Sequence, residues 1–217
     1  MSDAARPALA ELRLADPPAR WAGLGFRVEA DAAIVLGGVR LAFGAAGEGI
    51  VAWTLTGISA GVSDIDGLAT SVAAPPGPAA PAGPQPGTHP NGALALDHVV
   101  VLTPDFGRTA GALEQAELPL RRIRDAGGFR QGFRRLGPAI LELVEAVGAP
   151  AGPARFWGLV AIVQDLDGLA ARLGDRVGAV KPAVQPGRRI ATVRTSAGLG
   201  PALAFMSPGP EPGSKRH

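Results

Sequence analysis

Two apolar runs, Leu96-Asp97-His98-Val99-Val100-Val101-Leu102 and Ile140-Leu141-Glu142-Leu143-Val144-Glu145, open and close the stretch that decides the fold. Both are rich in aliphatic and β-branched residues, which favours strands. Each carries one polar side chain with ligand chemistry, His98 in the first and Glu142 in the second. Because side chains alternate along a strand, each of these residues shares a face with apolar neighbours two positions away. If the two strands face one concave sheet, an imidazole and a carboxylate converge in an apolar cup.

Residues 94–208 extend this pattern into the order βαβββ, repeated twice. Pro and Gly turns separate apolar runs of strand length, Thr103-Pro104-Asp105 opens the first helix, and Asp165-Leu166-Asp167-Gly168-Leu169 starts the second. The predicted helices span 103–116 and 166–173. The predicted strands span 96–102, 118–124, 129–136, 139–147, 156–163, 178–184, 188–195 and 202–206.

Residues 8–72 predict a smaller mixed unit. A short helix follows Asp16-Pro17-Pro18, a hairpin turn lies at Gly37-Gly38, and a second short helix begins at Asp64. The predicted strands span 9–15, 26–29, 32–36, 39–43 and 50–58. Residues 73–93, which include His89, are so rich in Pro, Gly and Ala that they predict an extended, semi-rigid linker. Residues 209–217 predict a disordered tail.

An internal repeat links the two halves of the chain. The apolar runs 39–43 and 50–55 are followed by Asp-x-Asp-Gly-Leu at 64–68. The runs 139–143 and 159–163 are likewise followed by Asp-x-Asp-Gly-Leu at 165–169. The repeat predicts that the first unit is a shortened copy of the second.

Composition bounds the class of protein. The 217 residues are 47% hydrophobic and 18% charged, which indicates a globular chain large enough for a real core. A net charge of +2, no Tyr and no dense basic run disfavour nucleic-acid binding. No apolar run is long enough to span a membrane, and Met1–Pro7 lacks the order of a signal peptide. With no Cys in the chain, we expect a cytoplasmic protein.

The order and spacing of four segments resemble the vicinal oxygen chelate superfamily, the glyoxalase, bleomycin-resistance and dioxygenase-like proteins. These segments are residues 96–101, 140–145, 160–167 and 203–206. The resemblance implies an α+β fold in which βαβββ modules form curled mixed sheets, a half-open barrel with helices outside, around a small-molecule pocket. It covers 94–208 as a complete glyoxalase-like domain and 8–72 as a degenerate, truncated one.

The resemblance also implies a divalent metal held by one ligand each from the first, fourth, fifth and eighth strands. His98 and Glu142 match the first two positions. The fifth-strand position falls on Gly158, or on Trp157 if the register slips, and the eighth falls on Ala204. Since catalytic metals normally have three protein ligands, this predicts an incomplete site and at most a weakly bound ion. The alternatives are a pocket-lining or core role for His98 and an ion pair with Arg for Glu142.

His98 and Glu142 are the predicted catalytic residues. Of the three His residues, His98 is the one plausible acid or base, because His89 falls in the linker and His217 at the terminus. Arginines on the predicted strands could hold an anionic group in bidentate fashion, and aromatic residues could line the same cup. Solvated outer faces and core packing are the alternatives for these side chains. The predicted substrate-binding residues are Arg122, Phe129, Phe133, Arg135, Trp157 and Arg194.

Three functions fit these observations. The first is a glyoxalase-like lyase, isomerase or dioxygenase-type enzyme, in which Glu142 and His98 transfer protons or hold a metal. The second is a pocket that sequesters a compound without chemistry, as resistance proteins of the superfamily do. The third is a dimerisation scaffold. The expected partners are a small ligand, which could be anionic, and a second copy of the chain.

Overall fold

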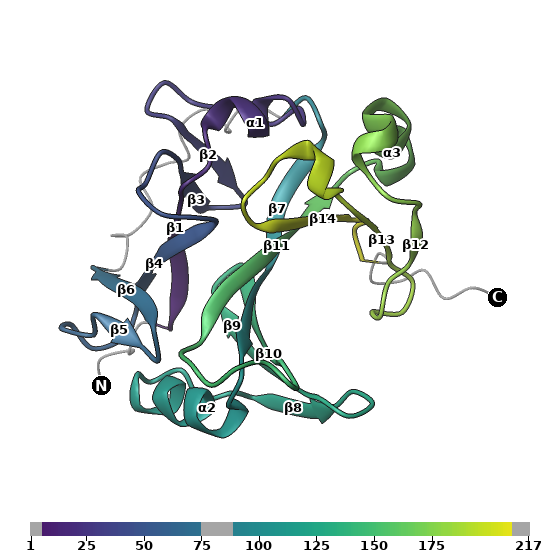
Figure 1. Ribbon diagram of the computed structural model, residues 1–217. Coiled ribbons are helices and arrows are strands. Elements are labelled where there is room, and N and C mark those ends of the chain that lie inside the picture. Colours follow the sequence, from purple (N-terminus) through teal and green to yellow (C-terminus); the bar gives the residue numbers. More distant parts are fainter. Residues whose placement is uncertain (1–5, 75–88, 210–217) are drawn as a thin grey trace.

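The computed structural model describes residues 6–74 and 89–209, so residues 75–88 of the predicted linker and 210–217 of the predicted tail lie outside the described residues. Figure 1 shows two curled mixed sheets side by side, the first in purple and blue, the second in teal, green and yellow. Neither described sheet closes into a barrel, and the helices lie outside them, which confirms the predicted α+β class. None of the helices in these two ranges is long and apolar enough to cross a membrane.

The C-terminal sheet has eight strands in the order β12-β13-β14-β11-β7-β10-β9-β8. Its strands and helices follow the predicted order, βαβββ twice. Three strands are much shorter than predicted, namely β8, the two-residue β12 and β13. The elements are β7 (Ala93–Thr103), α2 (Phe106–Gln115), β8 (Arg122–Asp125), β9 (Arg130–Leu136), β10 (Ala139–Glu145), β11 (Arg155–Val163), α3 (Leu166–Leu173), η1 (Gly174–Arg176), β12 (Lys181–Pro182), β13 (Arg189–Thr192), η2 (Thr195–Ala197) and β14 (Ala202–Met206).

The N-terminal sheet has six strands in the order β2-β3-β1-β4-β6-β5. Both the order and the parallel or antiparallel sense of each pair match the inner six strands of the C-terminal sheet, β9-β10-β7-β11-β14-β13. The first sheet therefore repeats the second without its two outermost strands. The elements are β1 (Ala8–Leu14), α1 (Pro18–Ala22), β2 (Ala33–Leu36), β3 (Val39–Ala42), β4 (Ile50–Thr56), β5 (Asp64–Ile65) and β6 (Leu68–Ala73).

The helix predicted at Asp64 is wrong, because the segment is the β5–β6 hairpin. Asp66 (φ 53°) and Gly67 (φ 92°) both have positive φ, as a type I′ turn requires. In both copies of the Asp-x-Asp-Gly-Leu motif, the first Asp accepts a hydrogen bond from the Gly N–H three residues on, at 2.8 Å from Asp64 and 2.9 Å from Asp165. The motif thus specifies a single turn. In the first copy this turn closes the β5–β6 hairpin, and in the second it begins α3. The strand predicted at 26–29 is also absent.

The buried apolar residues of the two sheets form one core. Trp53 of β4 meets Phe156 of β11 edge-on, with ring centroids 5.3 Å apart, and Phe26 stacks on Phe205 of β14 at 5.9 Å. His89, which the sequence placed in the linker, is buried: its Nδ1 accepts a hydrogen bond from the Arg27 N–H at 3.0 Å. His89 therefore packs against the N-terminal unit just before β7 begins.

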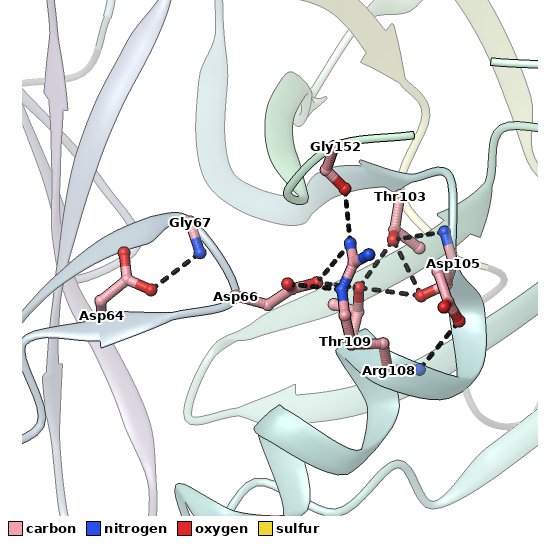
Figure 2. Close-up of polar contacts among 8 residues, drawn as sticks. All are labelled: Asp64, Asp66, Gly67, Thr103, Asp105, Arg108, Thr109 and Gly152. Carbon is pink, nitrogen blue, oxygen red and sulfur yellow. Dashed lines mark hydrogen bonds and ion pairs between the residues drawn. The ribbon is translucent and has the colours of Figure 1, made fainter. Parts of the chain in front are cut away.

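A polar contact fixes the β5–β6 turn to the start of α2 (Figure 2). The Arg108 guanidinium donates to both carboxylate oxygens of Asp66, at 2.7 and 3.2 Å, and to the Gly152 carbonyl. The buried Thr109 hydroxyl also donates to Asp66. Asp105 caps α2 by accepting from the Arg108 N–H at 3.0 Å. These contacts attach the β5–β6 turn of the N-terminal sheet to α2, the first helix of the C-terminal unit.

Candidate functional site

A cavity of about 460 Å³ lies on the face of the C-terminal sheet that carries Glu142. Its lining comes mainly from β7, β10, β11, β13 and β14, and most of the lining side chains are aliphatic or aromatic. Glu142 is the one ionisable group among the described lining residues; Gln131 and Thr192 add neutral polar groups. An apolar cavity with few convergent polar groups is the usual form of a small-molecule site.

His98 and Glu142 lie on one face of the sheet. In the parallel pairing of β7 with β10, Val100 is opposite Glu142 and His98 is opposite Ile140. Residues in register on parallel strands point the same way, so the two ligand-type side chains occupy neighbouring rows of this face. Glu142 lines the cavity directly, while His98 is buried with 4% of its surface exposed.

A buried cluster that the sequence did not reveal lies behind His98. The register shifts from Val160 opposite His98 to Ala161 opposite Leu96, so Asp97 is an extra, bulged residue. Its Oδ2 is 2.5 Å from His98 Nδ1, a close contact outside hydrogen-bond geometry, and its Oδ1 accepts from Arg188 Nη1 at 2.9 Å.

Burial raises the pKa of Asp97, but its contacts with His98 and Arg188 outweigh burial and hold that pKa below its usual value. Arg188 also donates Nε to the Ser207 carbonyl at 2.9 Å, and its side chain is 12% exposed. The signal for this cluster was the Asp-His pair in an apolar strand. Arg188 could not be predicted as the partner of Asp97, because the two residues are 91 positions apart in the sequence.

Glu142 is positioned by a chain of side chains from β8 and β9. Gln131 Nε2 donates to Glu142 Oε1 at 2.8 Å, and Gln131 Oε1 accepts from Arg124 Nε at 2.7 Å. The Arg124 guanidinium lies 5.3 Å from the ring centroid of Phe133. Burial raises the pKa of Glu142 above its usual value, and the nearby charges of His98 and Arg124 only reduce that rise. The carboxyl is therefore desolvated but held in one orientation.

The residues of this face do not fit the four-ligand metal set that the resemblance implies. Across β14, β11, β7 and β10, one row reads Ala204, Val160, His98, Ile140, and the next reads Ala202, Gly158, Val100, Glu142. Only His98 and Glu142 carry donor atoms in these rows. A Cβ at Gly158 would lie 2.5 Å from the Ala202 carbonyl oxygen, so the backbone leaves no space there for a ligating side chain. Within 6–74 and 89–209, no group of three or more His, Cys, Asp or Glu is placed to hold a metal.

The other predicted site residues fall in different places. Phe129 and Trp157 line the cavity with Glu142, and Trp157 lies at a bulge of β11 with 47% of its surface exposed. Arg194 lines a second cavity, which also touches Trp157. The lining of neither cavity includes Arg122, Phe133 or Arg135. Arg122 and Arg135 are exposed, and Phe133 lies half-buried beneath Arg124.

Comparison with known proteins yields matches only among solved structures; no family model and no curated protein matches the chain. A triple mutant of 4-hydroxymandelate synthase from Streptomyces coelicolor superposes with a TM-score of 0.62 and 17% identity, over 94% of this chain and 93% of that one. Methylmalonyl-CoA epimerase from Mycobacterium tuberculosis superposes with a TM-score of 0.43 and 18% identity, over 54% of this chain and 89% of the epimerase.

The first of these superpositions spans both sheets, so it compares the whole arrangement and not one module. Because the two chains are only 17% identical in sequence, this superposition is evidence for a shared fold alone. The extent of that superposition shows that the chain shares the fold of this synthase, and both sheets of the chain have the curled, mixed arrangement that the sequence resemblance implies.

Proposed function

We propose that the chain binds a small, largely apolar molecule in the cavity beside Glu142 and transfers a proton to or from it. The observation that carries this proposal is the desolvated carboxyl of Glu142, the one ionisable group among the described residues of a mostly apolar lining. A raised pKa brings a carboxylate closer to the strength of an effective general base at neutral pH. Perturbed carboxyls in clefts are also typical of functional sites.

The neighbouring groups support this role for Glu142. Gln131 holds Oε1, so the carboxylate is oriented while Oε2 forms no hydrogen bond within the described part of the chain. A bound molecule can therefore present its acidic proton to Oε2. His98 lies on the same face of the sheet, one row from Glu142, and so places an imidazole near the charge that develops.

The experiment is solvent deuterium incorporation. Compounds with an acidic C–H beside a carbonyl are first screened for binding by thermal shift, and the binders are then incubated with protein in D2O and followed by NMR or mass spectrometry. We expect the wild-type chain to exchange the acidic proton and Glu142→Gln to lose most of that exchange. Glu114→Gln is the matched control, since Glu114 is an exposed acid on α2.

Sequestration without chemistry is the second candidate, and the apolar lining together with Gly158 and Ala204 at the ligand positions favours it. Compounds that bind the wild-type chain and Glu142→Gln equally well, with no deuterium incorporated by either, would establish this alternative. They would also overturn the proton-transfer proposal.

A further inference from the structure

A second cavity of about 700 Å³ lies between the two sheets. One wall is the start of β4 and the loop before it, Glu48 to Val51. The other wall is the start of β11, the end of β13 and the segment that leads into β14. The cavity therefore exists only because the N-terminal sheet packs against the C-terminal one.

Two arginines give this cavity its charge. Arg155 is the first residue of β11, and Arg194 directly precedes η2. Neither forms an ion pair with a carboxylate in 6–74 or 89–209, whereas Arg108, Arg130 and Arg189 all do. Arg194 donates Nε to the Val177 carbonyl at 3.2 Å, which anchors the side chain, and neither of its Nη groups forms a hydrogen bond with any residue of 6–74 or 89–209. Glu48 is the one acid among the described lining residues, so the cavity carries a net positive charge.

The second cavity adjoins the one beside Glu142. Four residues, Trp157, Thr192, Ala202 and Leu203, line both. Trp157 is the one aromatic residue that lines both cavities, and 47% of its surface is exposed. A molecule longer than the first cavity can therefore pass over Trp157 and reach the arginines.

We infer that the ligand is an amphipathic anion, with its apolar part beside Glu142 and its negatively charged group between the sheets, held by Arg155 and Arg194. Guanidinium groups bind carboxylate and phosphate oxygens through paired, charge-assisted hydrogen bonds. The N-terminal unit thereby contributes to ligand binding, because the start of β4 and the loop before it close the anionic end of the site. This inference rests on the proposed function only in placing the apolar part of the ligand in the cavity beside Glu142.

The test uses two probes with the same apolar body. These are 8-anilinonaphthalene-1-sulfonate, which carries an anionic group, and neutral N-phenyl-1-naphthylamine. Binding is followed by probe fluorescence and by quenching of Trp157, since Trp21 and Trp53 are fully buried. We expect the sulfonate to bind about tenfold or more tightly than the neutral probe, and Arg155→Gln and Arg194→Gln each to weaken it about tenfold. The affinity for the neutral probe should stay unchanged in both variants.

Two controls separate a specific site from general attraction to positive charge. Arg172→Gln removes an exposed arginine on α3 and should leave both affinities unchanged. Glu48→Gln removes the acid of the lining and should tighten the sulfonate. If the wild type binds both probes equally, or the two cavity variants match Arg172→Gln, the anionic site is wrong while the apolar pocket stands. If neither probe binds, both proposals fail.

Discussion

At the scale of single residues, the pKa values of two buried carboxyls on the same sheet are shifted in opposite directions, upward for Glu142 and downward for Asp97. Burial raises the pKa of Glu142, so the folded chain holds its proton to a higher pH than the unfolded chain does. The free energy of unfolding therefore falls as pH rises from the unfolded pKa to the folded one. The pKa of Asp97 is lowered, so its contribution is present above the unfolded pKa and is lost as pH falls through the folded pKa.

The Asp97–Arg188 pair gives a direct stability prediction. Removing one partner leaves the other charge buried and uncompensated, because both side chains are nearly nine-tenths buried. We expect Asp97→Ala to lower the free energy of unfolding by about 3–5 kcal/mol in urea denaturation at pH 7. The double variant Asp97→Ala with Arg188→Met should lose much less than the sum of the two single variants. Additive losses would show that the two side chains do not act as a pair.

At the scale of elements, the β5–β6 turn depends on a glycine for two separate reasons. Gly67 has φ +92°, and a Cβ there would lie 2.4 Å from Pro153 Cβ and 3.1 Å from the Ala154 carbonyl oxygen. Gly38, in the β2–β3 turn, has φ +91° but open space where its Cβ would lie. The two positions share the same backbone strain and differ in packing against the second sheet.

We expect Gly38→Ala to cost about 1–3 kcal/mol of unfolding free energy, the strain of a left-handed alanine. Gly67→Ala should cost at least about 1 kcal/mol more, because Pro153 must move. Urea denaturation of the two variants measures the difference. Equal losses would mean that the turn is not packed against the 149–154 segment as the structure has it.

The sequence predicted most elements because their signals are local. Alternation identified β7 and β10, and the segments 103–105 and 165–169 identified the starts of α2 and α3, where Asp105 and Asp165 are the N-caps. The same reasoning failed at Asp64, because an Asp that binds the N–H three residues on begins a hairpin as readily as a helix. Shared faces could be predicted for His98 and Glu142. The bulge at Asp97 and the partnership with Arg188 could not, since both depend on pairing between distant strands.

At the scale of the whole molecule, the two sheets share one hydrophobic core and enclose the second cavity between them. Trp53 and Leu55 of β4 are fully buried, and Trp53 packs edge-on against Phe156 of β11. The N-terminal unit is therefore a structural part of the fold, and we expect residues 94–208 alone not to form a stable domain.

A chain of residues 94–208 should aggregate or give poorly dispersed NMR spectra, because removal of the first sheet exposes Phe156 and Phe205. The matched control is the full chain with a protease site placed within 75–88, whose two fragments should stay associated after cleavage. A soluble, monomeric 94–208 fragment with dispersed amide signals would show that the two units fold independently.

The central claim is that Glu142 is a desolvated carboxyl inside a ligand pocket, and its own titration tests this most directly. Carboxyl-carbon NMR, with the Glu142 signal assigned by its loss in Glu142→Gln, gives the pKa of the free chain and of the chain with N-phenyl-1-naphthylamine bound. We predict a pKa above the usual value of a glutamate, and a further rise when the apolar probe excludes water. An ordinary pKa that the bound probe leaves unchanged would contradict the account.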